Sequence, residues 1–301
     1  LIEDGKIVWA GQAGEEPATL LAGVEHHEYG KNLILPGFVD GHLHYPQIGV
    51  IASFGTQLLD WLETYTFPEE ARFADQKYAA ETAKLFLDLL LSNGTTTAAV
   101  FCTVHPQSAD AFFEECSARN LRMIAGKILM DRNAPDTVTD TAQSGYEDTK
   151  ALIEKWHGTG RNLYAVTPRF APTSTPEQLQ VCGSLMSEFP SVYLQSHLSE
   201  NTDEVRWVSD LFPEARSYQD VYARYGMLGP RSLYGHAIHM DEADLAQAAE
   251  TGTKFVHCPT SNLFIGSGLF RMKETWDANV GVLLGSDVGG GTSLSPFATM
   301  K

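Results

Sequence analysis

Two histidines stand one residue apart near the start of the chain, in the stretch PGFVDGHLHYPQ. His42 and His44 follow a run of apolar residues. Alternate side chains of a β-strand face the same side, so this pair could bind a single metal ion. A lone histidine at a strand end is more often a hydrogen-bonded loop residue. The pair gains meaning only if other ligands lie farther along the chain.

Residues of the same chemical kind follow later apolar runs. His197 lies in QSHLSEN, His236 in YGHAIHMD and Asp287 in LLGSD. Imidazole nitrogens and a carboxylate suit zinc or ferrous iron and leave a position for water. Glu200, three residues after His197, is a candidate to move protons beside a metal-activated water. No cysteine pairs supply the thiolates of a closed structural zinc site.

These side chains can meet only if the fold brings several strand ends together. We predict strands over residues 33–39, 95–101, 122–130, 163–170, 192–195, 232–235, 254–256 and 280–284. We predict helices over residues 75–91, 108–119, 146–156, 176–189, 218–225, 242–250 and 269–276, with a last helix beginning near Pro296. Parallel strands need such crossovers, and eight is the number at which a (β/α)₈ barrel closes. An open, doubly wound sheet is the alternative.

A TIM barrel would place the candidate residues on one face, because the C-terminal ends of its strands open on the same side. His42 and Asp287 would then lie within a few ångströms of each other although the whole predicted barrel separates them in sequence. Helix boundaries support the crossovers. Thr175 and Gln178 predict a capping box at the start of one helix, and Asp241 predicts the N-cap of another.

Composition excludes several classes of partner. The chain of 301 residues has 21 basic and 38 acidic residues, a net charge of −17, which disfavours nucleic acid and anionic membranes. It has no phosphate-binding glycine motif and no apolar stretch near the ~20 residues of a membrane span. Four scattered cysteines without CxxC spacing predict no disulfide framework and a cytoplasmic location.

The combined motifs resemble the amidohydrolase superfamily and, within it, the guanine deaminases. The superfamily has HxH after the first strand, histidines after the fifth and sixth, and an aspartate after the eighth. Here these are DGHLH, QSHLSEN, YGHAIH and GSD. The stretches HLHYPQ, ASFGTQLLDWLETYTFPEEARF, TPRFAPTST and HCPTSNLFIGSGLF are similar to those of guanine deaminases. The resemblance covers nearly the whole chain.

The resemblance implies a role for each candidate residue. It implies one catalytic metal ion, usually zinc with iron as the alternative, held by His42, His44, His197 and Asp287. It implies acid–base roles for Glu200 and Asp287, and a water-orienting role beside the metal for His236. It implies that the purine is recognised by Gln47, Arg169 and Phe170. Binuclear members have a lysine after the fourth strand, where this chain reads TPRFAP, so a single metal ion is expected.

The reaction implied by the resemblance is hydrolytic deamination of guanine to xanthine and ammonia by a metal-activated water. The alternatives are another amidohydrolase acting on an 8-oxoguanine, cytosine or triazine ring, or a non-catalytic barrel scaffold, which the intact ligand set disfavours. A homodimer is expected from the family alone.

The resemblance also implies a small β-sandwich subdomain that is built from both chain ends. Residues 1–34 are expected to form its N-terminal part, beginning with a hairpin that turns at Asp4-Gly5. Residues 35–301 are expected to form the barrel, truncated before or within its last helix. Because the chain starts without methionine and stops at SPFATMK, we expect it to be a segment of a longer protein.

Overall fold

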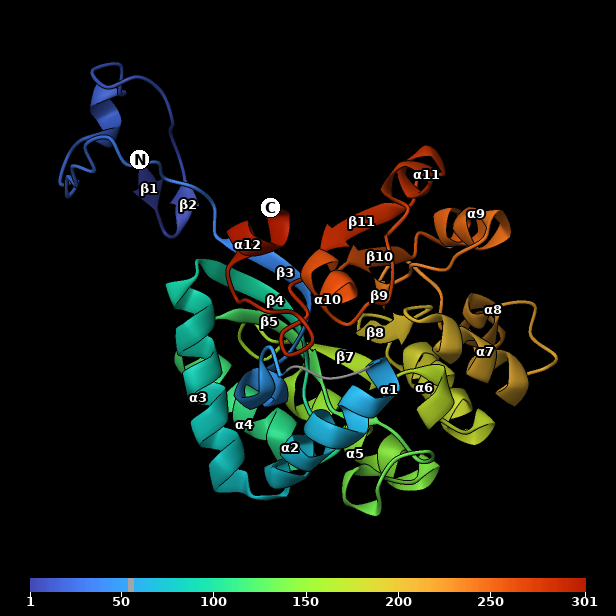
Figure 1. The fold of residues 1–301 in the computed structure, drawn as a ribbon. Helices are drawn as coiled ribbons and strands as arrows, with labels where there is room; N and C mark the ends of the chain where they lie inside the picture. Colours follow the sequence, from blue (N-terminus) through green and yellow to red (C-terminus); the bar gives the residue numbers. More distant parts are fainter. Residues whose placement is uncertain (54–56) are drawn as a thin grey trace. The chain divides into compact units, whose positions relative to one another are not determined.

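The structure is a computed structural model that describes residues 1–53 and 57–301. It divides into two compact units, Leu1–Pro36 and Gly37–Lys301 (Figure 1). Residues 54–56, which belong to the motif ASFGTQLLDWLETYTFPEEARF, lie outside the described residues.

The first unit contains the predicted hairpin. β1 (Ile2–Glu3) pairs antiparallel with β2 (Lys6–Ile7), and a 3₁₀ turn follows at Ala18–Leu20. Asp4 and Gly5 connect the strands with φ of 50° and 72°, the left-handed conformation that a tight hairpin turn needs. The turn is therefore confirmed. Membership of residues 1–34 in a β-sandwich stays a prediction.

The second unit is built on eight parallel strands in sequence order. They are β3 (Phe38–His44), β4 (Thr95–Phe101), β5 (Arg122–Gly126), β7 (Leu163–Pro168), β8 (Tyr193–Leu198), β9 (Ser232–His236), β10 (Lys254–His257) and β11 (Gly281–Leu284). Each pairs in parallel with the next, and the two-residue β6 (Ile128–Leu129) adds to β7. Strand order alone leaves open whether the sheet closes.

Backbone hydrogen bonds join the first strand to the segment that follows the last one. The amide of Asp287 donates to the carbonyl oxygen of His42 at 2.8 Å, and the amide of His44 donates to that of Val288 at 2.7 Å. The sheet therefore curls until its two edges meet. The predicted (β/α)₈ barrel is confirmed, and the open-sheet alternative is wrong.

Helices cover the outside of the barrel. The long ones are α3 (Gln76–Ser92), α4 (Pro106–Ala118), α5 (Ala142–Trp156), α6 (Pro176–Glu188), α7 (Thr202–Leu211) and α9 (Glu242–Thr251). The short ones are α8 (Tyr218–Arg224), α10 (Pro259–Phe264), α11 (Met272–Asp277) and α12 (Pro296–Met300). No helix in the described part of the chain is both long and apolar enough to cross a membrane.

The neighbouring helices α3 and α4 show why these segments are helical. Asp75 caps α3 by accepting from the amides of Lys77 and Tyr78, and α3 then lies beside α4 (Figure 1). The apolar face of α3 buries Phe86, which packs with Phe112 of α4 in the main core. An amphipathic stripe of this kind gains its stability by removing apolar surface from water.

Between β3 and α3 the chain forms a broken helical segment over the barrel mouth. It comprises α1 (Leu58–Trp61), a π-helical turn (Leu62–Thr66) and α2 (Phe67–Ala71). Trp61 and Phe67 from this segment pack with Phe101 and Phe170 in a second apolar cluster. The segment therefore supplies an apolar cover for the C-terminal ends of the strands.

The first strand starts later than predicted. It runs from Phe38 to His44, whereas Leu33 and Ile34, placed in the predicted strand, are 86% and 75% exposed. Apolar residues mark a strand only where a partner buries them, and the ladder with β4 begins at Phe38. The HxH pair is thus inside the strand rather than after it.

Two local predictions near Asp140 are also corrected. The strand predicted over 122–130 breaks at Lys127, whose buried ammonium donates to Asp140 at 2.5 Å. Gln178 does not close a capping box, because its side-chain amide donates to Asp140 at 2.7 Å, although Thr175 still caps α6. A buried carboxylate elsewhere in the chain competes for both side chains.

Candidate active site

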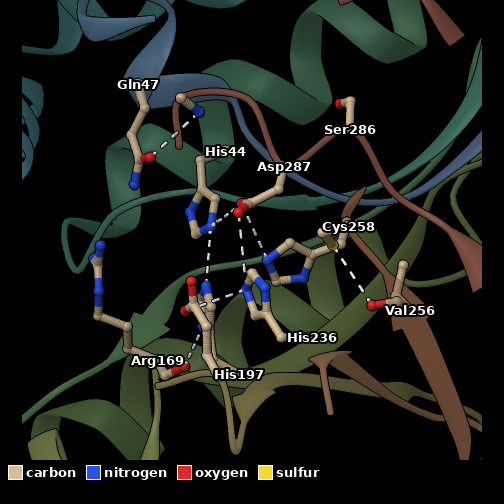
Figure 2. A network of polar contacts seen from close by, with 12 residues as sticks. His44, Gln47, Arg169, His197, His236, Val256, Cys258, Ser286 and Asp287 are labelled. Atoms are coloured by element: carbon tan, nitrogen blue, oxygen red, sulfur yellow. Dashed lines mark hydrogen bonds and ion pairs between the residues drawn. The ribbon is translucent and has the colours of Figure 1, made fainter. Parts of the chain in front are cut away.

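Five of the six predicted ligand or acid–base residues lie at the C-terminal ends of barrel strands. His42 and His44 end β3, His197 lies near the end of β8, His236 ends β9, and Asp287 follows β11. Figure 2 shows the labelled imidazoles turned toward the Asp287 carboxylate from different strands. Apart from half-buried His197, these residues are at most 5% exposed.

The donor atoms of this cluster are packed closely. The Nε2 atoms of His42 and His44 lie 3.4 and 3.5 Å from one carboxylate oxygen of Asp287, and the Nε2 atom of His236 lies 3.8 Å from the other. The Nε2 atoms of His44 and His197 are 3.1 Å apart. His42, His197, His236 and Asp287 each offer an atom within 4.8 Å of all the others.

The cluster fits a divalent metal ion. The Nε2 atoms of His42 and His236 are buried without a hydrogen-bond partner among the described residues, which is costly in a dry interior. A shared cation would satisfy both atoms and relieve the close approach of His44 and His197. Three or four imidazoles with one carboxylate form a donor set that suits zinc or iron.

Two of the imidazoles are oriented by bonds on their far side. Nδ1 of His197 donates to the carbonyl oxygen of Arg169 at 2.6 Å, and Nδ1 of His236 donates to the side-chain oxygen of Asn262 at 2.9 Å. With Nδ1 carrying the proton, the Nε2 lone pair of each ring faces the cluster. Fixing the tautomer in this way is typical of metal-binding histidines.

Glu200 lies beside this cluster. Its side chain is 2% exposed, one oxygen accepts from the hydroxyl of Ser267 at 3.0 Å, and the other lies 3.4 Å from Nε2 of His236. Burial raises the pKa of Glu200 to about 7, although the charge of His236 opposes that rise. A carboxyl of this pKa can both accept and release a proton at neutral pH.

A pocket opens onto the cluster. Its polar lining comprises His44, Gln47, Arg169, His197, Glu200, His236 and Asp287. Its apolar lining comprises Leu58, Trp61, Leu62, Phe170 and Ile265. All three predicted purine-recognising residues therefore face the same cavity as the predicted metal site. Apolar walls with convergent polar groups are typical of pockets that bind small molecules.

Comparison with known proteins places the chain in a family. The amidohydrolase family matches residues 33–301, which include every strand of the barrel and every residue of the cluster. The chain belongs to the amidohydrolase family. Membership of this family, together with the His/His/His/Asp cluster, indicates that the site holds a divalent metal ion.

Several relatives of this amidohydrolase are described as guanine deaminases. A guanine deaminase from Escherichia coli (strain K12) is 48% identical over 301 residues, which are 100% of this chain and 69% of that protein. A probable guanine deaminase from Deinococcus radiodurans is 46% identical over 271 residues, 90% of this chain and 62% of the relative. This chain thus spans about two thirds of the length of these relatives.

A solved structure extends the likeness to three dimensions. The crystal structure of guanine deaminase from C. acetobutylicum, with guanine bound in its active site, matches the amidohydrolase chain with a TM-score of 0.85. The two are 33% identical, and the match covers 88% of this chain and 64% of that one.

The electrostatics of the amidohydrolase cluster favour the protonation states that metal binding requires. Burial lowers the pKa of His42 and takes those of His44 and His197 well below the usual value. Burial alone would raise the pKa of Asp287, but the hydrogen bond and charge of His42 and the charge of His236 bring it below its usual value. Neutral imidazoles and an ionised carboxylate are the ligand forms that bind metals.

His236 differs from the other three histidines. Burial opposes its charged form, yet the nearby carboxylates of Glu200 and Asp287 raise its pKa above the usual value. It is therefore the imidazole of the cluster best suited to carrying a proton. Its assignment as a metal ligand or as a water-orienting residue stays a prediction.

Sequence reasoning did not find the residues that support this site. Asp40 accepts from the amides of His42 and Ser286, at 3.2 and 3.0 Å, and so ties β3 to the closing segment. Glu70, Asn262 and Ser267 bond the side chains of predicted site residues. All four residues stand inside motifs that resemble those of guanine deaminases or the amidohydrolase superfamily, and that position was the only signal in the sequence.

Backbone strain is concentrated at the same strand ends. Ser199, His236 and Asp287 adopt φ of 47°, 69° and 50°, the left-handed region that non-glycine residues rarely occupy. Gly235 is required for a different reason. A Cβ atom there would lie 2.6 Å from Cε1 of His42, so only glycine lets β9 approach this imidazole. Strain and close packing are typical of functional sites.

Proposed function

We propose that this amidohydrolase chain is the catalytic barrel of a guanine deaminase, which converts guanine and water to xanthine and ammonia. One observation carries the proposal: a single pocket joins a metal-competent cluster and a proton-transferring carboxyl to a wall of amide and guanidinium donors. The guanine deaminases that the chain resembles support the same substrate.

The metal site that we propose consists of His42, His44, His197 and Asp287, with His236 beside it. The donor set favours one zinc ion, with iron as the alternative. When bound, the ion supplies the Lewis acidity that makes water nucleophilic at neutral pH. The protein contributes the orientation of the imidazoles through Arg169 and Asn262, and the apolar cover that limits access of bulk water.

Glu200 is the residue that we assign to proton transfer. In the proposed reaction a water oxygen adds to the C2 carbon of guanine, and Glu200 moves one proton of that water to the neighbouring ring nitrogen. The second proton passes through Asp287 or His236 to the exocyclic amine. The bond between C2 and this amine then breaks, and ammonia leaves while xanthine remains.

The opposite wall of the pocket recognises the base in this proposal. Arg169 and Gln47 present N–H donors to a carbonyl oxygen and ring nitrogen of the purine, and Phe170 packs on its plane. Hydrogen-bonding side chains in a buried pocket discriminate strongly, because an analogue without the matching group leaves them unpaired.

A panel of bases tests the proposed function. The purified full-length protein, loaded with zinc, would be assayed for ammonia release from guanine, 8-oxoguanine, cytosine and a triazine. Guanine should be turned over with a kcat/KM at least about 100-fold above that of any other base. Faster turnover of another base would show that this base, and not guanine, is the preferred substrate. Absence of ammonia release from every base would remove the deaminase assignment.

Two further properties follow from the same proposal. A cytoplasmic location suits the four free, buried cysteines. A homodimer is the expected assembly, and sedimentation of the full-length protein would distinguish it from a monomer.

A further inference from the structure

Glu70 is a buried carboxylate that touches both predicted purine-recognising polar side chains. It lies on α2, within the segment that covers the barrel mouth, and is 1% exposed. One of its oxygens accepts from the Gln47 side-chain amide at 2.9 Å, and the other accepts from the Arg169 guanidinium at 2.7 Å. The resemblance to guanine deaminases implied no role for Glu70, and Glu70 is not part of the metal cluster.

The contact with Glu70 fixes which way the Gln47 amide faces. An ionised carboxylate only accepts hydrogen bonds, so the NH₂ group of Gln47 must face Glu70. Its carbonyl oxygen then accepts from the amide of Gly289 at 3.4 Å. Figure 2 shows the Gln47 side chain on the same side of the cluster as Arg169. A neutral acceptor–donor group at position 70 would allow either orientation.

The contact with Glu70 also holds the charge of Arg169. A buried guanidinium needs an anionic partner, and the pair with Glu70 is buried on both sides, at 3% and 1% side-chain exposure. Glu200 and Asp287 line the same pocket as Arg169, so a guanidinium that lost Glu70 would be attracted to those carboxylates.

We propose that Glu70 is a positioning residue that adapts the pocket to purines with a carbonyl at C6. This inference rests on the proposed guanine deaminase function and deepens it. By engaging one guanidinium N–H and one amide N–H, Glu70 fixes the remaining donors of Arg169 and Gln47 toward the ligand. Its carboxylate also balances the guanidinium charge, so the recognising edge is neutral and suits a neutral carbonyl.

The matched substrate pair for a test is guanine and 2-aminopurine. Both carry the C2 amine that is removed, but only guanine has the carbonyl at C6. The variant Glu70→Gln keeps the shape of the side chain and replaces one acceptor oxygen with an NH₂ group facing the donors. Glu69→Gln is the control, since Glu69 lies on the same helix but bonds Arg72 and Tyr78 outside the pocket.

Glu70→Gln should lower kcat/KM for guanine about 100-fold, a loss that misplacement of a group by about 1 Å can cause. Turnover of 2-aminopurine should stay within about 3-fold, and most of the guanine effect should appear in KM. Glu69→Gln should leave the ratio of the two substrates unchanged. An equal loss on both substrates in Glu70→Gln would overturn the inference and leave Glu70 a purely structural residue.

Equilibrium binding separates this inference from the proposed function. Hypoxanthine has the C6 carbonyl but no C2 amine, and purine has neither, so neither is deaminated at C2. Glu70→Gln should weaken hypoxanthine binding and leave purine binding unchanged; equal changes would contradict the inference even if guanine is the substrate. Absence of ammonia release from guanine by the wild-type protein would instead contradict the proposed function. Should Glu70→Gln fail to fold, Glu70→Asp provides the same comparison with the charge kept and the oxygens withdrawn.

Discussion

On one side of the pocket lies the metal-competent cluster, in which the Nε2 atoms of His42 and His236 are buried without hydrogen-bond partners among the described residues. On the other side, Gln47 and Arg169 both bond Glu70 with good geometry. We call the first the metal wall, comprising His42, His44, His197, His236 and Asp287. We call the second the recognition wall, comprising Gln47, Glu70, Arg169 and Phe170.

The difference between the walls separates what the protein completes itself from what it must bind. The recognition wall carries its own counter-charge, so it is pre-organised before a ligand arrives. The metal wall brings lone pairs and one carboxylate together, and this arrangement is favourable only around a cation. Perturbations of the two walls should therefore have separable consequences.

Removing the metal should have the largest effect. Extended chelation of the full-length protein should abolish guanine turnover and lower the melting temperature, because a ligand present at 100 times its Kd stabilises the native state by about 2.7 kcal/mol. Hypoxanthine binding should persist, since the recognition wall is complete without the metal. Unchanged turnover by protein in which elemental analysis finds no metal would contradict a catalytic role for the metal wall.

Glu200→Gln should have the next largest effect, a loss of about 10²- to 10⁴-fold in kcat with little change in KM. The carboxamide keeps the shape and the contact with Ser267 but cannot carry a proton between water and the ring. Metal content, measured by elemental analysis, should stay that of the wild type. Turnover within a few-fold of the wild type would exclude Glu200 from proton transfer.

Asn262→Ala should have a smaller effect, about 10- to 100-fold on metal affinity or activity, the typical cost of losing a residue that orients a metal-site histidine. The substitution removes the acceptor for Nδ1 of His236 and frees the ring to turn or change tautomer. Kinetics at saturating zinc, compared with Ser184→Ala on the exposed side of α6, would measure the difference. Equal activities would show that Asn262 does not set the orientation of His236.

The two walls differ as much in how far sequence could predict them. The metal wall lies at strand ends, and strand ends of a parallel barrel converge whatever the connecting loops do. Alternation of apolar strands with amphipathic helices was therefore enough to bring His42 and Asp287 together before any geometry was known. The first strand was placed too early, over 33–39 rather than Phe38–His44, because Leu33 and Ile34 are apolar but exposed and the C-terminal half of the strand is polar.

The recognition wall depends on a loop that no periodicity describes. Glu70 reaches Gln47 and Arg169 only because the segment from α1 to α2 folds over the barrel mouth through a π-helical turn. In FPEEA, Glu69 and Glu70 fall in the first turn of a helix. Carboxylates at this position are stabilised by the helix dipole and commonly face solvent. Local pattern could not show that the Glu69 side chain keeps 11% of its surface exposed while Glu70 is buried against the pocket residues.

The central claim is that one metal ion on the metal wall and one purine on the recognition wall together produce xanthine. Titrating chelated full-length protein with zinc while following xanthine and ammonia from guanine tests it most directly. The account predicts equal amounts of the two products, and activity that rises with zinc and saturates at about one ion per chain. Saturation at two ions per chain, or no xanthine at any zinc loading, would contradict it.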